Sequence, residues 1–318
     1  MAREEFEQRL RIGTSGYSYP GPPPKGWHCV FYPKTKGKRF GELEYYASFF
    51  NTVEINTTFY KPPAAGMAEA WVRKTPSDFE FAVKVWQKFT HPMKLGEGIG
   101  EAQGKWGSPT AADIDLFKKG IAPLAESRKL GILLFQYPPG FHYTKENLER
   151  LHWALTAFND YPKAVELRHR SWSDRNKETG ALLDQSSAAW VVIDEPKFAS
   201  SVKQEFEPIG EIFYLRLHGR NREKWWTHRE MWERYDYFYG PEEIQFLGDK
   251  IRELAQKSPE TKIYVFFNNH ARGQAVANGL MLKHEVGQEI NADVPSALVE
   301  VYPQLAGFVR GAGQQGLF

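Results

Sequence analysis

The stretch VEINTTFY, residues 53–60, places a charged and an amide side chain in an otherwise apolar strand. Val53 and Ile55 alternate with Glu54 and Asn56, and successive side chains of a strand point to opposite faces. A charge in a protein interior is costly unless it is paired and hydrogen-bonded. Glu54 and Asn56 therefore indicate a polar pocket at the end of this strand.

Seven further runs that are rich in β-branched or aromatic residues also predict strands. The eight runs begin at Arg11, Thr52, Phe79, Leu130, Lys163, Ala188, Glu211 and Lys262. Segments with helical periodicity lie between most of them, at residues 39–50, 110–129, 144–159 and 241–257. This alternation predicts an α/β fold, a closed (β/α)8 TIM-type barrel, with an open doubly wound sheet as the alternative. We expect a single domain over residues 1–318, with a core of about residues 11–290 and an extension at each end.

Polar residues occupy one face of most predicted strands, always in the C-terminal half of the strand. Beyond Glu54 and Asn56 they are Lys84, Gln136, Glu166, Arg168, Asp194, Arg216, His218, Asn268 and Asn269. Catalytic residues of barrel enzymes come from the C-terminal ends of several strands. We therefore expect these side chains to line one pocket at the mouth of the barrel.

The charges of this predicted pocket balance. Three carboxylates, Glu54, Glu166 and Asp194, face three cations, which are Lys84, Arg168 and Arg216. Cations on three strands suit a phosphate or carboxylate group of a ligand. The three carboxylates and His218 are the candidate catalytic residues, as general acids or bases. The alternative is an internal ion-pair network without a catalytic role.

A divalent metal is a second alternative, because the three carboxylates and His218 are acceptable ligand types. The balance of charge makes a metal site the weaker prediction, and the sequence points to no cofactor other than this divalent metal. Ser15 lies in GTSGY, which lacks the G-x-S-x-G spacing of a nucleophile elbow. No G-x-G-x-x-G or phosphate-loop pattern is present, and Cys29 is the chain's one cysteine.

Three long connections follow predicted strands, at residues 20–29, 87–108 and 219–240. Long connections in compact domains are often lids or binding loops. Basic and aromatic residues interleave in residues 219–240, as in surfaces that stack single-stranded bases. Five basic and four acidic residues leave this loop a net charge of +1, so a hydrophobic lid is the favoured role and nucleic-acid binding the alternative.

The composition sets further limits. The chain has 318 residues, of which 42% are hydrophobic, and a net charge of +2. This charge argues against binding nucleic acid or anionic lipid through bulk charge. No stretch approaches the roughly 20 apolar residues of a membrane span, so we expect a soluble, cytoplasmic protein without a membrane partner.

The sequence resembles the YecE-like domain family of unknown function, whose members are closed α/β barrels. The motifs that carry the resemblance are GTSGY, FYP, VEINTTFY, FAVKV, LLFQYPPGF, VELRHRSW, YLRLHGR and FFNN. The resemblance implies a shared pocket formed by Glu54, Asn56, Tyr60, Lys84, His91, Gln136, Glu166, Arg168, Trp172, Arg216, His218 and Asn269. Residues 20–29 depart from the family pattern as an insert, and Tyr17 stands where the family motif has Trp.

These observations predict an uncharacterised barrel enzyme that binds a small polar or anionic ligand and performs acid–base or hydrolytic chemistry. A metal-dependent phosphodiester hydrolase is the first alternative, on the analogy of the fold alone. A noncatalytic barrel that binds nucleic acid or a protein partner through residues 219–240 is the second.

Overall fold

The computed structural model describes residues 3–91 and 108–310 of the chain. They form two compact units. The first unit contains residues 1–54, 192–197 and 206–318, and the second contains residues 55–191 and 198–205, as far as these are described. The single domain predicted from the sequence stays a prediction.

The first unit is built on a four-stranded sheet in the order β1-β9-β8-β7. Its strands are β1 (Leu10–Thr14), β7 (Val192–Asp194), β8 (Ile212–Leu217) and β9 (Lys262–Phe267). All three pairings are parallel, with Thr14 and Leu217 each opposite Phe267. The carboxyl ends of these strands therefore lie along one edge of the sheet.

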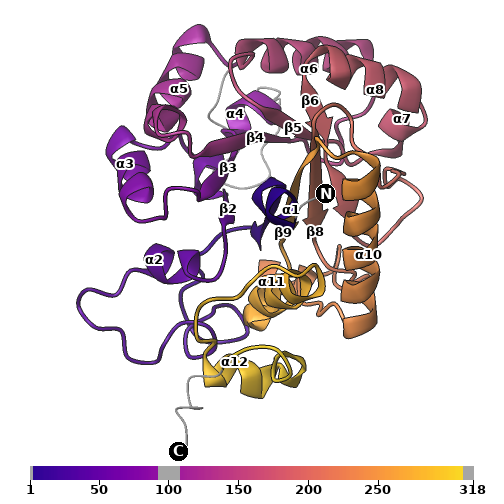
Figure 1. Ribbon diagram of the computed structural model, residues 1–318. Coiled ribbons are helices and arrows are strands. Elements are labelled where there is room, and N and C mark those ends of the chain that lie inside the picture. The colour runs from indigo at the N-terminus through magenta and orange to yellow at the C-terminus, as the bar shows by residue number, and fades with distance from the viewer. Residues whose placement is uncertain (1–2, 92–107, 311–318) are drawn as a thin grey trace, which may run out of the picture. The chain divides into compact units, whose positions relative to one another are not determined.

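The helices of the first unit are α1 (Arg3–Arg9), α2 (Glu42–Ala47), α9 (Met231–Arg234), α10 (Pro241–Lys257), α11 (Gln274–Glu285) and α12 (Ser296–Val301). Short 3-10 helices span Ala271–Gly273 and Pro303–Leu305. The helices α10 and α11 pack side by side, and α11 also contacts β1 and β9 (Figure 1). These contacts bury the apolar side chains of the sheet, among them Ile12, Ile263 and Val265.

The other sheet has five strands in the order β2-β3-β4-β5-β6. Its strands are β2 (Thr52–Ile55), which begins in the first unit, β3 (Glu80–Lys84), β4 (Leu130–Gln136), β5 (Lys163–Glu166) and β6 (Ala188–Trp190). The pairings from β3 to β6 are parallel. The helices of the second unit are α3 (Ala65–Arg73), α4 (Gln87–Thr90), α5 (Ala111–Glu126), α6 (Lys145–Ala157), α7 (Arg170–Ser173) and α8 (Asn176–Gln185), with a 3-10 helix at Thr57–Phe59.

The α/β class with parallel sheets is confirmed, and each predicted run contains a strand. The prediction of one strand for the run from Ala188 is wrong, because the run forms two strands, β6 and β7. The N–H of Val191 donates to Val165 O at 2.9 Å, whereas from Val192 onward the chain pairs with β8. The run therefore passes from one sheet to the other at Val191. Closure of the sheets into a barrel stays a prediction.

The predicted helices are also present, with shorter bounds in three cases. The helix expected over residues 39–50 begins after Gly41 and ends at Ala47. The helix α5 begins at Ala111, one residue after the predicted start, because Thr110 is its N-cap and forms a capping box with Asp113. Of the long loop at residues 87–108, residues 92–107 lie outside the described part of the chain.

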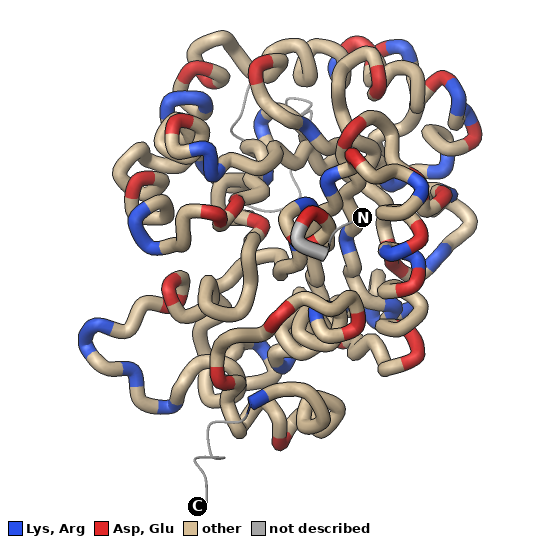
Figure 2. The backbone as a smooth tube through the Cα atoms, viewed as in Figure 1, with Lys and Arg blue, Asp and Glu red and all other residues tan. Residues whose placement is uncertain are grey.

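Acidic and basic residues are interspersed over the described part of the chain (Figure 2). In α10, for example, Lys250 and Lys257 each pair with Glu253, at 2.9 and 2.7 Å. This mixture agrees with the net charge of +2. None of the helices in the described residues is both long and apolar enough to cross a membrane.

Candidate functional site

The Glu54 carboxylate, at the end of β2, accepts three hydrogen bonds from β8. Tyr214 donates its hydroxyl to Oε2 at 2.7 Å. Arg216 donates from Nε to Oε2 at 2.9 Å and from Nη2 to Oε1 at 2.6 Å. The two side chains on β8 are two residues apart and reach the same carboxylate, as the predicted alternation requires. Glu54 and Tyr214 are 0% exposed and Arg216 is 2% exposed, so this is a buried, bidentate ion pair.

The sequence around Gly13 brings the ends of β1 and β2 close together. A Cβ atom on Gly13 would lie 2.2 Å from the carbonyl oxygen of Thr52, so a larger residue does not fit there. Beyond this contact Ser15 pairs with Glu54 in a parallel bridge, and Gly16 donates its N–H to Glu54 O at 2.8 Å. The motif GTSGY therefore positions its serine beside the ion pair.

Ser15 has a buried hydroxyl for which no hydrogen-bond partner is found among the described residues. The residue is 1% exposed, and its Oγ atom is enclosed. Its backbone is satisfied, because the N–H donates to Phe267 O at 2.9 Å and the carbonyl accepts from the Tyr19 hydroxyl. Buried polar atoms without a partner are uncommon and each calls for an explanation.

His218 follows Arg216 by two residues and is 1% exposed. Its Nδ1 atom lies 2.8 Å from Nδ2 of Asn268, which follows β9. An amide NH2 group donates, so in this orientation Nδ1 accepts and a neutral imidazole carries its proton on Nε2. Trp225 and Tyr235 flank the imidazole, with ring centres 6.4 and 6.2 Å away.

An aromatic stack continues from this cluster. The rings of Tyr19 and His270 stack at 4.6 Å, and Tyr235 lies 5.3 Å from His270. Burial lowers the pKa of His270 from 6.5 to about 4, so this imidazole is neutral at pH 7. Burial, followed by the negative charge of Glu54, raises the pKa of Tyr19 well above its ordinary value. The nearby hydroxyl of Tyr19 is therefore protonated at neutral pH.

These residues form one group, which we call the Glu54 site. Its members are Ser15, Tyr19, Glu54, Tyr214, Arg216, His218, Asn268 and His270. All of them belong to the first unit, and most follow or end the strands β1, β2, β8 and β9.

Asp194, a predicted catalytic residue, lies in a different ion-pair network. Arg220 donates to its Oδ2 atom at 2.6 Å through Nη2, and the Tyr239 hydroxyl donates to Oδ1 at 2.8 Å. Arg220 also pairs with Glu243 of α10 at 2.7 Å. With 42% of the Arg220 side chain exposed, this network is only partly shielded from water. Its contacts tie the start of loop 219–240 to β7 and α10.

Asn269, predicted to bind ligand, forms hydrogen bonds with the same loop, residues 219–240, and with α11. It is 0% exposed and donates from Nδ2 to Tyr237 O and to Asn278 Oδ1, each at 2.8 Å. Its position immediately after β9 thus serves to hold the end of loop 219–240.

Other predicted residues lie in the second unit, as one ion pair and as two residues that contact the ring of Phe59. Glu166, at the end of β5, pairs with Arg168 at 3.5 Å, and both are buried. The Lys84 ammonium lies 3.9 Å from the centre of the Phe59 ring. His91 contacts the same ring edge-on at 5.0 Å, and burial, followed by the charge of Lys84, lowers its pKa to about 4. A pocket shared by these residues with the Glu54 site stays a prediction.

The remaining candidates of the second unit differ in their surroundings. Trp172 is 0% exposed and donates its indole N–H to Phe141 O at 2.6 Å, so it serves the packing of the loop after β4. Tyr60 is 66% exposed. Asn56 lies just beyond β2, before the 3-10 helix, and Gln136 is the last residue of β4.

In the described part of the chain, no three His, Cys, Asp or Glu side chains come together as ligands of a metal ion. The candidate metal ligands Glu54 and Asp194 instead pair with arginines, as described above.

Four members of the site are not among the residues predicted from the sequence: Ser15, Tyr19, Tyr214 and His270. The sequence predicts no nucleophilic role for Ser15, because its motif lacks the G-x-S-x-G spacing. Tyr19 and His270 follow strands in loops, where alternation carries no information. The signal that could have found Ser15 was its position, at the carboxyl end of β1 like the polar residues of the other strands.

The comparisons with known proteins point to one family. The model of "Protein of unknown function DUF72" matches residues 11–299. The UPF0759 protein YunF of Bacillus subtilis (strain 168) is 31% identical over 287 residues, which is 86% of this chain and 96% of YunF.

Two solved structures of DUF72 family proteins are similar as well. One, from Enterococcus faecalis V583, is 28% identical with a TM-score of 0.73, over 88% of this chain and 96% of that one. Another, from Thermotoga maritima MSB8, is 33% identical with a TM-score of 0.71, over 88% of this chain and 99% of that one. The similarity therefore extends over nearly the whole of each relative.

Proposed function

Because this chain belongs to the DUF72 family, also called YecE-like, whose function is unknown, we propose an activity from its own side chains. The protein is an enzyme that binds a small polar ligand at the Glu54 site and performs acid–base chemistry on it. Ligands that carry a phosphate or carboxylate group are included.

The observation that carries this proposal is the buried, unpartnered hydroxyl of Ser15 beside the ion pair. Leaving a buried hydroxyl without a partner costs about 1–3 kcal/mol. A protein tolerates such a cost where the group serves a function, such as hydrogen bonding to a ligand. A polar ligand that reaches Ser15 would also meet the charges and hydroxyls next to it.

The Glu54–Arg216 pair supports this role as a positioning element. A buried ion pair is weak evidence for stability, because desolvation offsets the attraction between the charges. The two hydrogen bonds fix the plane of the guanidinium group, and the Tyr214 hydroxyl fixes the carboxylate. The pair is neutral as a whole, so the site favours a polar ligand and does not require a strongly charged one.

His218 is the proposed acid–base residue. Its Nδ1 atom accepts from Asn268, which leaves Nε2 to hold and transfer the proton. A positioned histidine of this kind contributes typically 10²–10⁴-fold to a reaction rate. The carboxylate Glu54, by contrast, is occupied by three hydrogen bonds and acts through Arg216.

The test is a screen of small polar metabolites, with and without phosphate or carboxylate groups, against the purified protein. Binding is measured as a shift of the melting temperature, and turnover by mass spectrometry. We expect Ser15→Ala to weaken the binding of a hit and His218→Gln to abolish turnover while binding persists. If no compound is converted, or His218→Gln keeps full activity, the proposal is wrong.

We also propose that the parallel sheets are parts of one closed (β/α)8 barrel. Support comes from the order of alternating strands and helices and from the parallel bridge between Ser15 and Glu54, which links the ends of β1 and β2. A crystal structure tests this proposal, because in a closed barrel every strand pairs with a neighbour on both sides.

A further inference from the structure

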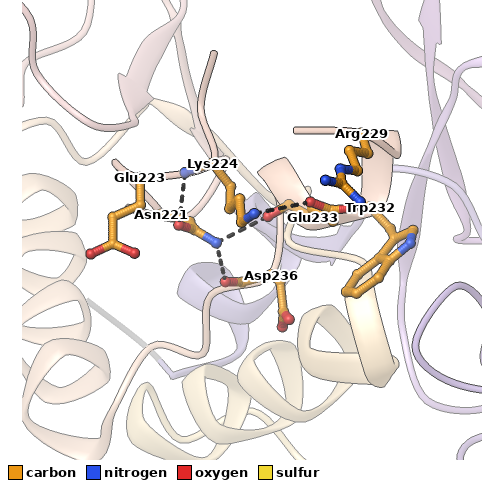
Figure 3. Close-up of a pocket in the computed structure, with 7 residues that line it drawn as sticks. All are labelled: Asn221, Glu223, Lys224, Arg229, Trp232, Glu233 and Asp236. Carbon is orange, nitrogen blue, oxygen red and sulfur yellow. Dashed lines mark hydrogen bonds and ion pairs between the residues drawn. The ribbon is translucent and has the colours of Figure 1, made fainter. Parts of the chain in front are cut away.

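Loop 219–240 contains a pocket that lies outside the Glu54 site. Its volume is about 550 Å³, within the range of small-molecule sites. Seven residues line it: Asn221, Glu223, Lys224, Arg229, Trp232, Glu233 and Asp236 (Figure 3).

The loop around this pocket is held in place by side-chain amides. Asn221 donates from Nδ2 to Glu233 O at 3.0 Å and to Asp236 O at 3.1 Å (Figure 3). Gln274 of α11 accepts from the N–H of Tyr237 at 3.0 Å and donates to Asp236 Oδ1 at 2.8 Å. These contacts fix both sides of the loop, so the pocket exists before a ligand arrives.

Most of the charges in the pocket are already paired. Lys224 lies 3.5 Å from Glu233. Asp236 accepts from Gln274, as above, and from Arg272 at 3.4 Å. The carboxylate of Glu223 and the guanidinium of Arg229, in contrast, have no hydrogen bond or ion pair with any residue in the described ranges. One charge of each sign is therefore left for a ligand.

Glu223 and Arg229 lie on opposite sides of the pocket, and Arg229 lies beside Trp232 (Figure 3). Trp232 itself is held by a hydrogen bond from its indole N–H to Glu230 Oε2 at 3.1 Å. A ligand that matches this arrangement has a positive group at one end, a negative group at the other and an apolar part near the negative end.

We propose that the pocket in loop 219–240 binds a small zwitterion with charges at its two ends, of the class of short peptides with free termini. The ammonium group pairs with Glu223, the carboxylate pairs with Arg229, and an apolar side chain next to the carboxylate packs on Trp232. A nucleotide fits less well, because three carboxylates and two cations give the lining a net charge of −1.

Calorimetry with the dipeptide glycyl-leucine, its N-acetylated form and its C-terminal amide tests the proposal. We expect the free dipeptide to bind and each blocked form to bind about threefold more weakly, as removal of one partly exposed ion pair predicts. In Glu223→Gln the N-acetyl group should make no further difference, and in Arg229→Gln the amide should make none. Trp232→Leu should weaken all three.

Trp226→Leu is the matched control, because Trp226 is a 56% exposed tryptophan of the same loop that does not line the pocket. This variant and His218→Gln should bind the dipeptide as the unchanged protein does, which separates the pocket from the Glu54 site. The proposal is overturned if the free dipeptide does not bind saturably or if the blocked forms bind equally well. Binding of adenosine monophosphate that is lost in Trp232→Leu would replace it with a nucleotide site.

Discussion

Arg216 holds Glu54 by two hydrogen bonds of 2.9 and 2.6 Å in an environment where both side chains are almost fully enclosed. The residues are 162 positions apart in the sequence, so the pair joins β2 to β8. Each charge is tolerated in the interior because the other is present. Replacing one of the two residues should therefore destabilise the protein more than replacing both.

Removal of one partner is expected to destabilise the protein strongly. Arg216→Met leaves the Glu54 carboxylate buried without its counter-charge, which lowers the free energy of unfolding by about 3–5 kcal/mol. The double variant Glu54→Leu/Arg216→Met should lose less than Arg216→Met alone. Urea unfolding measures both, and losses that simply add would contradict the coupling.

Ser15→Ala should stabilise the ligand-free protein. The change removes a buried hydroxyl that has no partner in the described structure, which should raise the free energy of unfolding by about 1 kcal/mol. The neighbouring Thr14→Val is the matched control, because Thr14 Oγ1 donates to Gly16 O at 2.7 Å and should cost stability when removed. Thermal unfolding of both variants checks this, and a loss of stability in Ser15→Ala would show that its hydroxyl is bonded within the protein.

The stability of the protein should fall in acid in part through His270. Its pKa is 6.5 ordinarily and about 4 in the folded protein, because burial disfavours the charged form. Between pH 4 and pH 6.5 the unfolded chain binds more protons at this residue than the folded protein does. The contribution of His270 to the free energy of unfolding is therefore fully present above pH 6.5. It is lost as the pH falls to about 4, at up to about 1.4 kcal/mol per pH unit.

His270→Phe keeps an aromatic ring against Tyr19 and removes the titration. Urea unfolding of this variant between pH 4 and 7 should therefore show a shallower pH dependence than the unchanged protein. Equal slopes would mean that the imidazole does not change its pKa on folding.

The ion pair between Arg220 and Asp194 should matter much less for stability than the Glu54–Arg216 pair. The Arg220 side chain is 42% exposed, and exposed pairs contribute about 0–1 kcal/mol. Arg220→Met is accordingly expected to lower the free energy of unfolding by less than about 1 kcal/mol. If Arg220→Met lowered the free energy of unfolding as much as Arg216→Met does, the Arg220–Asp194 network would be a major source of stability.

The sequence predicted the strands and which side chains share the polar face of each strand, because alternation has a physical cause. Tyr214 and Arg216 are two residues apart on one strand, so they had to share a face, and both contact Glu54. The role of Asp194 was not visible in the same way. Its partners, Arg220 and Tyr239, lie in a loop whose path no periodicity describes.

The unpartnered hydroxyl of Ser15 and the pocket in loop 219–240 could not be predicted from the sequence, for a related reason. Whether a hydroxyl finds a partner depends on distances of a few tenths of an ångström, which a sequence pattern does not encode. The pocket depends on amides such as Asn221 that bond to the backbone within one loop. The run from Ala188 likewise divides at Val191 because of its backbone hydrogen bonds. Val191 bonds to Val165 of β5, whereas the residues after it pair with β8.

The most direct test of the Glu54 site as a ligand site is a crystal structure of the protein with the tightest-binding compound of the metabolite screen. The account predicts a polar ligand atom within about 3.2 Å of Ser15 Oγ, with the Glu54–Arg216 pair intact beside it. A compound bound elsewhere, with Ser15 Oγ hydrogen-bonded to another protein group, would contradict it.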